Sequence, residues 1–253
     1  MRIALLSDLH ANRHALEACL LDARGRSADQ YAFLGDLVGY GGEPGAVLDR
    51  VMDLQARGAW VLRGNHDEAA LASPALGPPG RTVTGDHGAA WTGAQLSPAQ
   101  REFLAGLPLV LRHDFIFLVH ASANDPGQWH YVDDGRAAQA SLDAACVNGV
   151  THVFGGHVHE QRLYFQGAGR GVMPFAPTPG VAIAVRQPRR WLAAVGAVGQ
   201  PRDGTPSAMY ALFDTTALQL VFLRVPYDVA GAARAIRQAG LPAFYADRLA
   251  QGQ

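Results

Sequence analysis

Short apolar runs alternate with amphipathic stretches over the first part of the chain. The runs have the length of buried strands, and each ends abruptly in polar residues: Ile3–Leu6, Tyr31–Leu34 and Trp60–Leu62. Between them, apolar residues recur at helical spacing after Asn12 and again after Pro44, and these stretches end near Gly25 and Gly58. Successive β-α units of this kind predict a parallel sheet with helical crossovers.

The rest of the chain has a mixed pattern. Ser73–Gly85 is rich in Pro and Gly and predicts a surface loop. Further helices are expected over residues 87–95, 98–105, 135–147 and 228–240, the last of them blocked by Pro242. Strands are expected over 107–112, 115–119, 151–154, 163–166, 181–185, 191–195, 208–214 and 218–225, the last two as a hairpin. We expect a single domain over residues 1–253, in which the part from about residue 200, a β-hairpin plus a helix, completes the fold.

The composition excludes several classes of site. The sequence contains no Lys, which rules out a P-loop lysine, a Schiff-base lysine and a protein-kinase strand lysine. The net charge of −1 gives no overall field that would recruit nucleic acid or an anionic membrane. Cys19 and Cys146 form no C-x-x-C pair, which indicates a reducing compartment. With no leader and no apolar run near the length of a membrane span, we expect a cytoplasmic protein.

Side chains with metal-ligand chemistry follow the predicted strands. Asp8 and His10 lie two residues apart, so in an extended chain they point to the same side, just beyond a strand end. Other strand ends carry Asp36, Asn65, His66, His120, His157 and His159. These oxygen and imidazole donors are enough for two divalent cations, and Asp36 is the natural bridge because a carboxylate can bind two ions. The spacing leaves open whether His157 and His159 share one ion or bind one each.

The order of these motifs resembles the calcineurin-like metallophosphoesterase superfamily. The resemblance is carried by Asp8-Leu9-His10, Gly35-Asp36, Gly64-Asn65-His66-Asp67, His120 and Gly156-His157-Val158-His159. The turn after Asp36 and the segment Gly199–Asp203 look more like small prokaryotic phosphoesterases of the YfcE-like type than like protein serine/threonine phosphatases. The resemblance implies an α/β fold in four layers, an α-β-β-α sandwich of two mixed sheets flanked by helices.

The resemblance also implies how two metal ions are bound. It assigns one ion to Asp8, His10, Asp36 and His159, and the second ion to Asp36, Asn65, His120 and His157. We expect manganese first, with iron, zinc or nickel as alternatives. Such a pair of ions holds a bridging water as hydroxide, which attacks phosphorus in line. His66 is not a ligand in the family pattern, so we expect it to protonate the leaving oxygen or stabilise the transition state, with Asp67 orienting its ring.

Three further side chains are candidates for substrate contact. Arg63 can clamp a phosphate with two hydrogen bonds, or it can form a salt bridge behind the site. Tyr40 can stack on a base or simply pack against its neighbours. His14, on the first predicted helix, can bind substrate or serve a structural role.

Together these features predict a dinuclear metal-dependent phosphohydrolase. Its substrate would be a small phosphodiester, phosphomonoester or nucleotide polyphosphate. One alternative is a nuclease of the same superfamily, against which the charge balance argues. A second is a non-catalytic metal-binding scaffold, which should lack the catalytic histidine or a ligand. We expect no membrane partner and no nucleic-acid partner, and we leave open a homo-oligomer.

Overall fold

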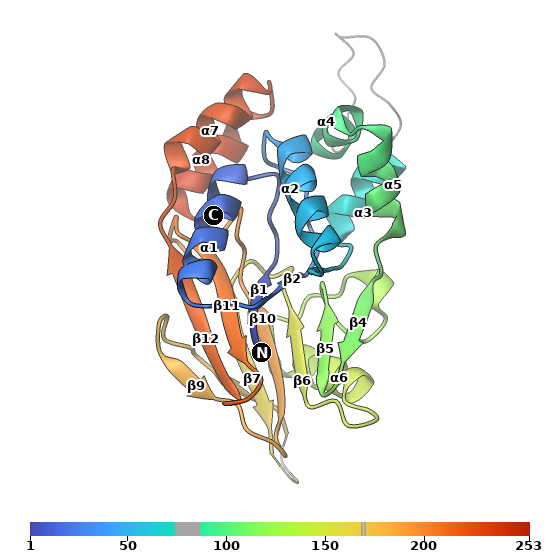
Figure 1. Cartoon of the computed structure of the whole chain (residues 1–253), viewed down its shortest axis with the longest axis vertical. Helices are drawn as coiled ribbons and strands as arrows, with labels where there is room; N and C mark the ends of the chain where they lie inside the picture. The colour runs from blue at the N-terminus through green and yellow to red at the C-terminus, as the bar shows by residue number, and fades with distance from the viewer. Residues whose placement is uncertain (74–86, 168, 170) are drawn as a thin grey trace.

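Two six-stranded β-sheets lie face to face, with helices on their outer sides (Figure 1). The computed structural model describes residues 1–73, 87–167, 169 and 171–253. The first sheet contains, in spatial order, β3 (Trp60–Val61), β2 (Gln30–Phe33), β1 (Arg2–Leu6), β11 (Ala208–Asp214), β12 (Gln219–Val225) and β9 (Ala182–Ala184). The second contains β4 (Val110–His113), β5 (Ile116–Val119), β6 (His152–Gly155), β10 (Arg190–Val195), β7 (Gln161–Gln166) and β8 (Met173–Phe175).

The helices cover both outer faces of this pair of sheets. α1 (Arg13–Gly25) and α2 (Pro44–Ala56) pack on the first sheet, and α6 (Gly135–Ala145) packs on the second. The next three helices are α3 (Asn65–Ala72), α4 (His87–Gln95) and α5 (Pro98–Gly106), and α2 contacts the last two of them. The last two helices, α7 (Val229–Gln238) and α8 (Ala243–Gln251), pack on each other, and α7 contacts α1 (Figure 1).

Strand β1 shows why the sequence pattern produces this layering. Ile3 and Leu5 point into the cluster between the two sheets, where they meet Phe213. Ala4 and Leu6 point the opposite way, into the cluster under the helices. Because both faces of the strand are buried, its apolar residues are continuous instead of alternating. The resulting order of helix, sheet, sheet and helix confirms the predicted four-layer α/β sandwich.

Parallel pairing brings the polar strand ends to one edge. β1, β2 and β3 are mutually parallel in the first sheet, and β5, β6 and β10 are parallel in the second. Other pairs, such as β1 with β11, are antiparallel, so both sheets are mixed. The carboxyl ends of the parallel strands are where open α/β sheets hold their ligands.

Several predicted elements differ from the observed ones. The hairpin β11–β12 is confirmed, but the helix before Pro242 is not the last, because α8 begins directly after this proline. A proline that blocks one helix is well suited to start the next. α3 and β8 were not predicted, and β4 starts at Val110 instead of residue 107. The predicted loop Ser73–Gly85 lies almost wholly outside the described residues. None of the described helices is long and apolar enough to cross a membrane.

Candidate metal centre

Seven donor side chains meet at the carboxyl ends of strands from both sheets. They are Asp8, His10, Asp36, Asn65, His120, His157 and His159. Among the described residues, the candidate donor atoms form two groups in which every atom lies within 4.8 Å of the others. Both groups are built from buried side chains, and both include Asp36. The structure therefore brings together every side chain that the sequence marked as a ligand.

The first group surrounds the Nε2 atoms of His10 and His159. These two atoms lie 3.1 Å apart, and His159 Nε2 is 3.2 Å from Asp8 Oδ1. His10 Nε2 is also 3.7 Å from Asp36 Oδ2. The structure thus groups the imidazole of His159, and not that of His157, with Asp8 and His10, a choice that spacing alone leaves open.

The second group surrounds His120. Its Nε2 lies 3.4 Å from Asp36 Oδ2 and 3.1 Å from the amide oxygen of Asn65. His157 completes the group, and its buried Nε2 has no hydrogen-bond partner among the described residues. Asp36 Oδ2 thus faces histidines of both groups, while its Oδ1 accepts a hydrogen bond from the main-chain N–H of His66.

The outer nitrogens of three imidazoles fix where their lone pairs point. Nδ1 of His10, His120 and His159 lies 3.1, 2.9 and 2.6 Å from a main-chain carbonyl oxygen. A carbonyl only accepts, so Nδ1 carries the proton and a neutral ring presents the lone pair of Nε2 to the group. The facing Nε2 atoms of His10 and His159 would then both be acceptors, 3.1 Å apart. A cation between them satisfies both lone pairs, so the donors fit a divalent metal.

The backbone at these ligands adopts a conformation that few residues tolerate. Five of the seven have φ in the left-handed region: Asp8 at 54°, His10 at 46°, Asp36 at 52°, His157 at 68° and His159 at 59°. Asp and His enter this region more readily than most residues, but each occurrence still costs on the order of 1 kcal/mol. Such strain clusters at functional sites, where the strained backbone conformation points the side chain in the direction that the function requires.

The electrostatics of the centre leave its two carboxylates charged. Burial by itself would raise the pKa of Asp8 and Asp36, but neighbouring histidines hold both below the ordinary value, His159 foremost for Asp8 and His120 for Asp36. Burial opposes protonation of His120, yet the charge of Asp36 raises its pKa to about 9. Burial and then His120 lower the pKa of His157 to about 4. Charged carboxylates and the neutral His157 imidazole are the forms that bind metal, whereas His120 would have to release a proton when a cation binds.

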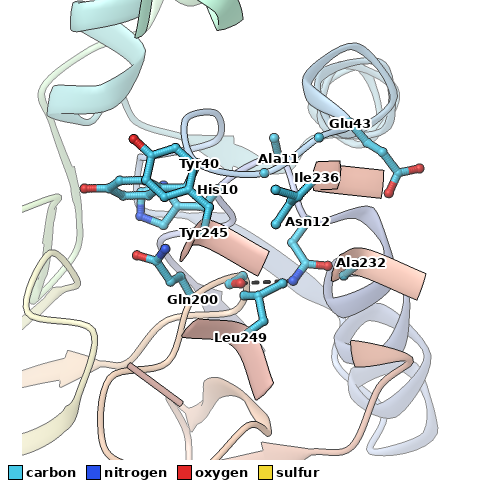
Figure 2. Close-up of a pocket in the computed structure, with 13 residues that line it drawn as sticks. His10, Ala11, Asn12, Tyr40, Glu43, Gln200, Ala232, Ile236, Tyr245 and Leu249 are labelled. Carbon is cyan, nitrogen blue, oxygen red and sulfur yellow. Dashed lines mark hydrogen bonds between the residues drawn. The ribbon is translucent and has the colours of Figure 1, made fainter. Parts of the chain in front are cut away.

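His66 and Tyr40 form a wall of the centre. The His66 ring lies against that of His10, with centroids 5.0 Å apart, and against that of Tyr40 at 4.5 Å. Tyr40 also contacts His10 and Tyr245 of α8. His10, Tyr40 and Tyr245 border a small pocket between the loops after β1 and β2 and the helices α7 and α8. Figure 2 shows Tyr40 and Tyr245 close together beside His10, with Gln200 nearby.

Asp67 lies directly behind this wall, but its carboxylate faces the main chain. Oδ1 accepts hydrogen bonds from the N–H groups of Leu37 and Val38, and Oδ2 accepts one from Gly64. Burial and then the charge of Asp36 raise the pKa of Asp67 to about 7, against the effect of these donors. No hydrogen bond among the described residues joins Asp67 to the His66 ring, so it does not orient that ring directly. Instead it ties the loop after β2 to the start of α3.

Two of the candidates for substrate contact are engaged elsewhere. Arg63 Nη1 lies 3.4 Å from the carbonyl oxygen of Ala105, and Nε is 4.0 Å from Glu68. These contacts match the structural alternative for Arg63. His14 lies between Glu43, at 3.5 Å, and Asp228 of the α7 cap, at 3.7 Å. Both side chains therefore contribute to packing around the centre, and Tyr40 alone of the three contacts a ligand ring.

The sequence did not point to several neighbours of the centre. Tyr131 stacks on His157, with ring centroids 4.1 Å apart, and Trp129 approaches His120 at 5.8 Å. Both come from the loop before α6, where no periodicity indicates a fixed position. The main-chain carbonyl of Gln200 holds His159, a role that depends on no side chain and so leaves no residue-type signal.

Comparisons with known proteins agree with this geometry. A family profile described as calcineurin-like phosphoesterase matches residues 1–161. An uncharacterized protein of Methanocaldococcus jannaschii is 29% identical over 263 aligned residues, covering 99% of this chain and 98% of the relative. The crystal structure of a metallophosphoesterase from Sphaerobacter thermophilus has a TM-score of 0.87 at 36% identity, covering 100% of this chain and 99% of the other. A hypothetical protein from Pyrococcus horikoshii OT3 shares the fold, with a TM-score of 0.78 at 19% identity and coverage of 100% and 98%.

Proposed function

Because the chain belongs to the calcineurin-like phosphoesterase family, we propose that it hydrolyses small phosphorylated molecules with two divalent cations bound at this centre. The family and the His/Asp cluster make it a metal-dependent phosphoesterase. The number of cations and the substrate class are the proposal. It is carried by one observation: Asp36 Oδ2 faces the Nε2 atoms of His10 and His120, which belong to different groups.

The two donor groups and the contact between Asn65 and His120 support the ligand sets. One cation would be held by Asp8, His10, Asp36 and His159, and the other by Asp36, Asn65, His120 and His157. The mixture of oxygen and imidazole donors suits manganese first, and iron, zinc or nickel as alternatives. When bound, such a pair of cations supplies positive charge that activates a water molecule and stabilises the phosphoryl oxygens during in-line displacement.

His66 is the group that we assign to proton transfer. Its ring is partly exposed beside His10, so it can reach a substrate held at the centre. It would donate a proton to the leaving oxygen as the bond to phosphorus breaks. Asp67 acts as a positioning residue, since its carboxylate holds the turn from which His66 and Asn65 project. We also propose that residues 1–253 form one domain, since β11 pairs with β1, and β12 with β11, in one sheet.

The test compares two aryl monoesters and a bis-aryl phosphate, with manganese added, for the wild-type protein, His66→Gln and a matched control. We expect kcat of His66→Gln to fall by about 100-fold or more for phenyl phosphate. The loss should be smaller for 4-nitrophenyl phosphate, whose leaving group needs less protonation. His113→Gln is the control, because His113 lies on β4 against Trp60 and Asp114.

Metal content is measured on the same samples. His66→Gln should keep the wild-type content, because His66 is in neither donor group. Equal losses for both leaving groups would remove the proton-donor role. A wild-type protein that contains metal but hydrolyses none of the three esters and no phosphoanhydride would overturn the proposed function.

A further inference from the structure

Arg202 stands next to the metal centre on the loop between β10 and β11. Its main-chain N–H donates to the carbonyl oxygen of His159, at 3.2 Å, so its position is tied to an expected ligand. Its guanidinium carbon lies 5.8 Å from the centroid of the Tyr40 ring. The same ring is 4.5 Å from that of His66. Arg202 therefore lies on the side of the centre where His66 would meet the leaving group.

The charge of Arg202 is not neutralised by the protein. Its Nη2 donates to the side-chain oxygen of Gln200, at 2.9 Å, and its buried Nε has no hydrogen-bond partner among the described residues. No described carboxylate forms an ion pair with it, and the adjacent Asp203 is bound instead by Arg224. A partly buried cation without a counter-charge is costly unless an anion binds to it. The neutral Gln200 holds the guanidinium in place without supplying that anion.

Tyr40 fixes the direction of this guanidinium. Its ring is itself held by contacts with His10 and with Tyr245 of α8, both visible in Figure 2. A guanidinium over an aromatic face keeps its edge free for hydrogen bonds. A planar fork of N–H donors matches the oxygens of a phosphate group, to which it can donate two bonds at once.

We propose that Arg202 binds a second phosphate group of the substrate, the one carried by the leaving group. The inference rests on the proposed function, and it narrows the substrate class to phosphoanhydrides such as a nucleoside diphosphate or polyphosphate. The reacting phosphoryl group lies at the donor groups of the centre, and the bond that breaks joins its phosphorus to the bridging oxygen. The leaving phosphate keeps the electron pair of that bond, takes a proton from His66 and is held by Arg202. Water supplies the oxygen that the reacting phosphorus gains.

The experiment measures binding of inorganic pyrophosphate and inorganic phosphate by calorimetry, in excess manganese. Proteins compared are the wild type, Arg202→Gln and Arg202→Lys. We expect Arg202→Gln to weaken pyrophosphate binding by about 10- to 100-fold, as for loss of charged hydrogen bonds, and phosphate binding by less than about 3-fold. Arg202→Lys should lie between, because it keeps the charge but loses the fork.

Arg189→Gln is the matched control. The Arg189 guanidinium also lies over an aromatic ring, 5.5 Å from the centroid of Phe165, but on the exposed surface of the second sheet. This variant should bind both anions like the wild type. Metal content and thermal unfolding are recorded for every variant, and if Arg202→Gln does not fold, Arg202→Lys decides the result.

Two results would overturn the proposal. If Arg202 variants lose phosphate and pyrophosphate affinity equally, Arg202 contacts the reacting phosphoryl group or only shapes the centre. If they lose neither, Arg202 binds no phosphate. The proposed function fails separately, when the metal-loaded wild type hydrolyses no phosphoester or phosphoanhydride. The ratio of the two affinities tests Arg202 in either case.

Discussion

The Asp67 carboxylate joins the loops after β2 and β3. Oδ1 lies 2.9 Å from the N–H nitrogen of Leu37 and 3.1 Å from that of Val38, and Oδ2 lies 2.8 Å from that of Gly64. The substitution Asp67→Ala removes the acceptor of all three hydrogen bonds. It leaves three main-chain donors without a partner in the interior, where Asp67 is completely buried.

The expected loss of stability follows from this count. Each buried donor left without a partner costs about 1–3 kcal/mol, so three of them give about 3–9 kcal/mol. Water that enters the space left by the carboxylate would bring the loss toward the lower value. Even that value is a large share of the roughly 5–15 kcal/mol by which a folded domain is stable. Asp67→Asn should lose less, because its amide oxygen can still accept from Leu37 and Val38.

The assay is urea unfolding followed by circular dichroism, with chelator present so that metal binding does not contribute. Asp214→Ala is the control. Its carboxylate also accepts from two main-chain N–H groups, those of Thr216 and Ala217, but in a partly exposed turn where water can replace it. If Asp67→Ala lowers the free energy of unfolding no more than Asp214→Ala does, the three hydrogen bonds are not what holds the loops.

Two further predictions concern the ligands. Asp36→Asn should lower the content of both cations, and Asp8→Asn mainly that of one, because only Asp36 belongs to both donor groups; equal losses by inductively coupled plasma mass spectrometry would contradict the bridging assignment. Gly156→Ala should lower metal content and activity, since its Cβ would collide with the side chains of Ser7 and Asp8. Gly167→Ala, whose Cβ would meet no atom of the described residues within 4 Å, should change neither, and a similar loss in both variants would refute the steric explanation.

Local pattern predicted most of the fold, and its failures have a common cause. β1 was predictable because its four buried apolar residues are contiguous and end in polar ones. α3 was missed because its buried face includes Asp67, so no apolar stripe indicates a helix. α8 follows Pro242, and the sequence pattern predicts only that this proline ends the preceding helix. Asp67 of α3 instead accepts hydrogen bonds from Leu37 and Val38, and α8 packs on α7 and places Tyr245 against Tyr40, contacts that local periodicity does not encode.

The centre shows the same division between donors and their surroundings. The seven donors were recognisable because each follows a short apolar run in the sequence. The directions of the Arg63 and Asp67 side chains were not recognisable from the sequence. Both residues lie two positions from Asn65, and only packing decides which way each side chain points. The sequence does not predict that the guanidinium of Arg202 lacks a carboxylate partner. Which charges lie near Arg202 depends on the fold, in which the adjacent Asp203 pairs with Arg224.

The sequence by itself determined which donors exist and that each stands at a strand end, because strand length and polarity are local properties of the chain. It also favoured Asp36 as the bridging candidate, since a carboxylate can bind two cations and Asp36, unlike Asp8, has no histidine donor next to it at its strand end. Only the tertiary structure decided which donors share a group. His159 meets Asp8 and His10 across the interface of two sheets, and Asp36 lies between them and His120. Those neighbours depend on how the sheets pack, which a spacing of residues along the chain does not encode.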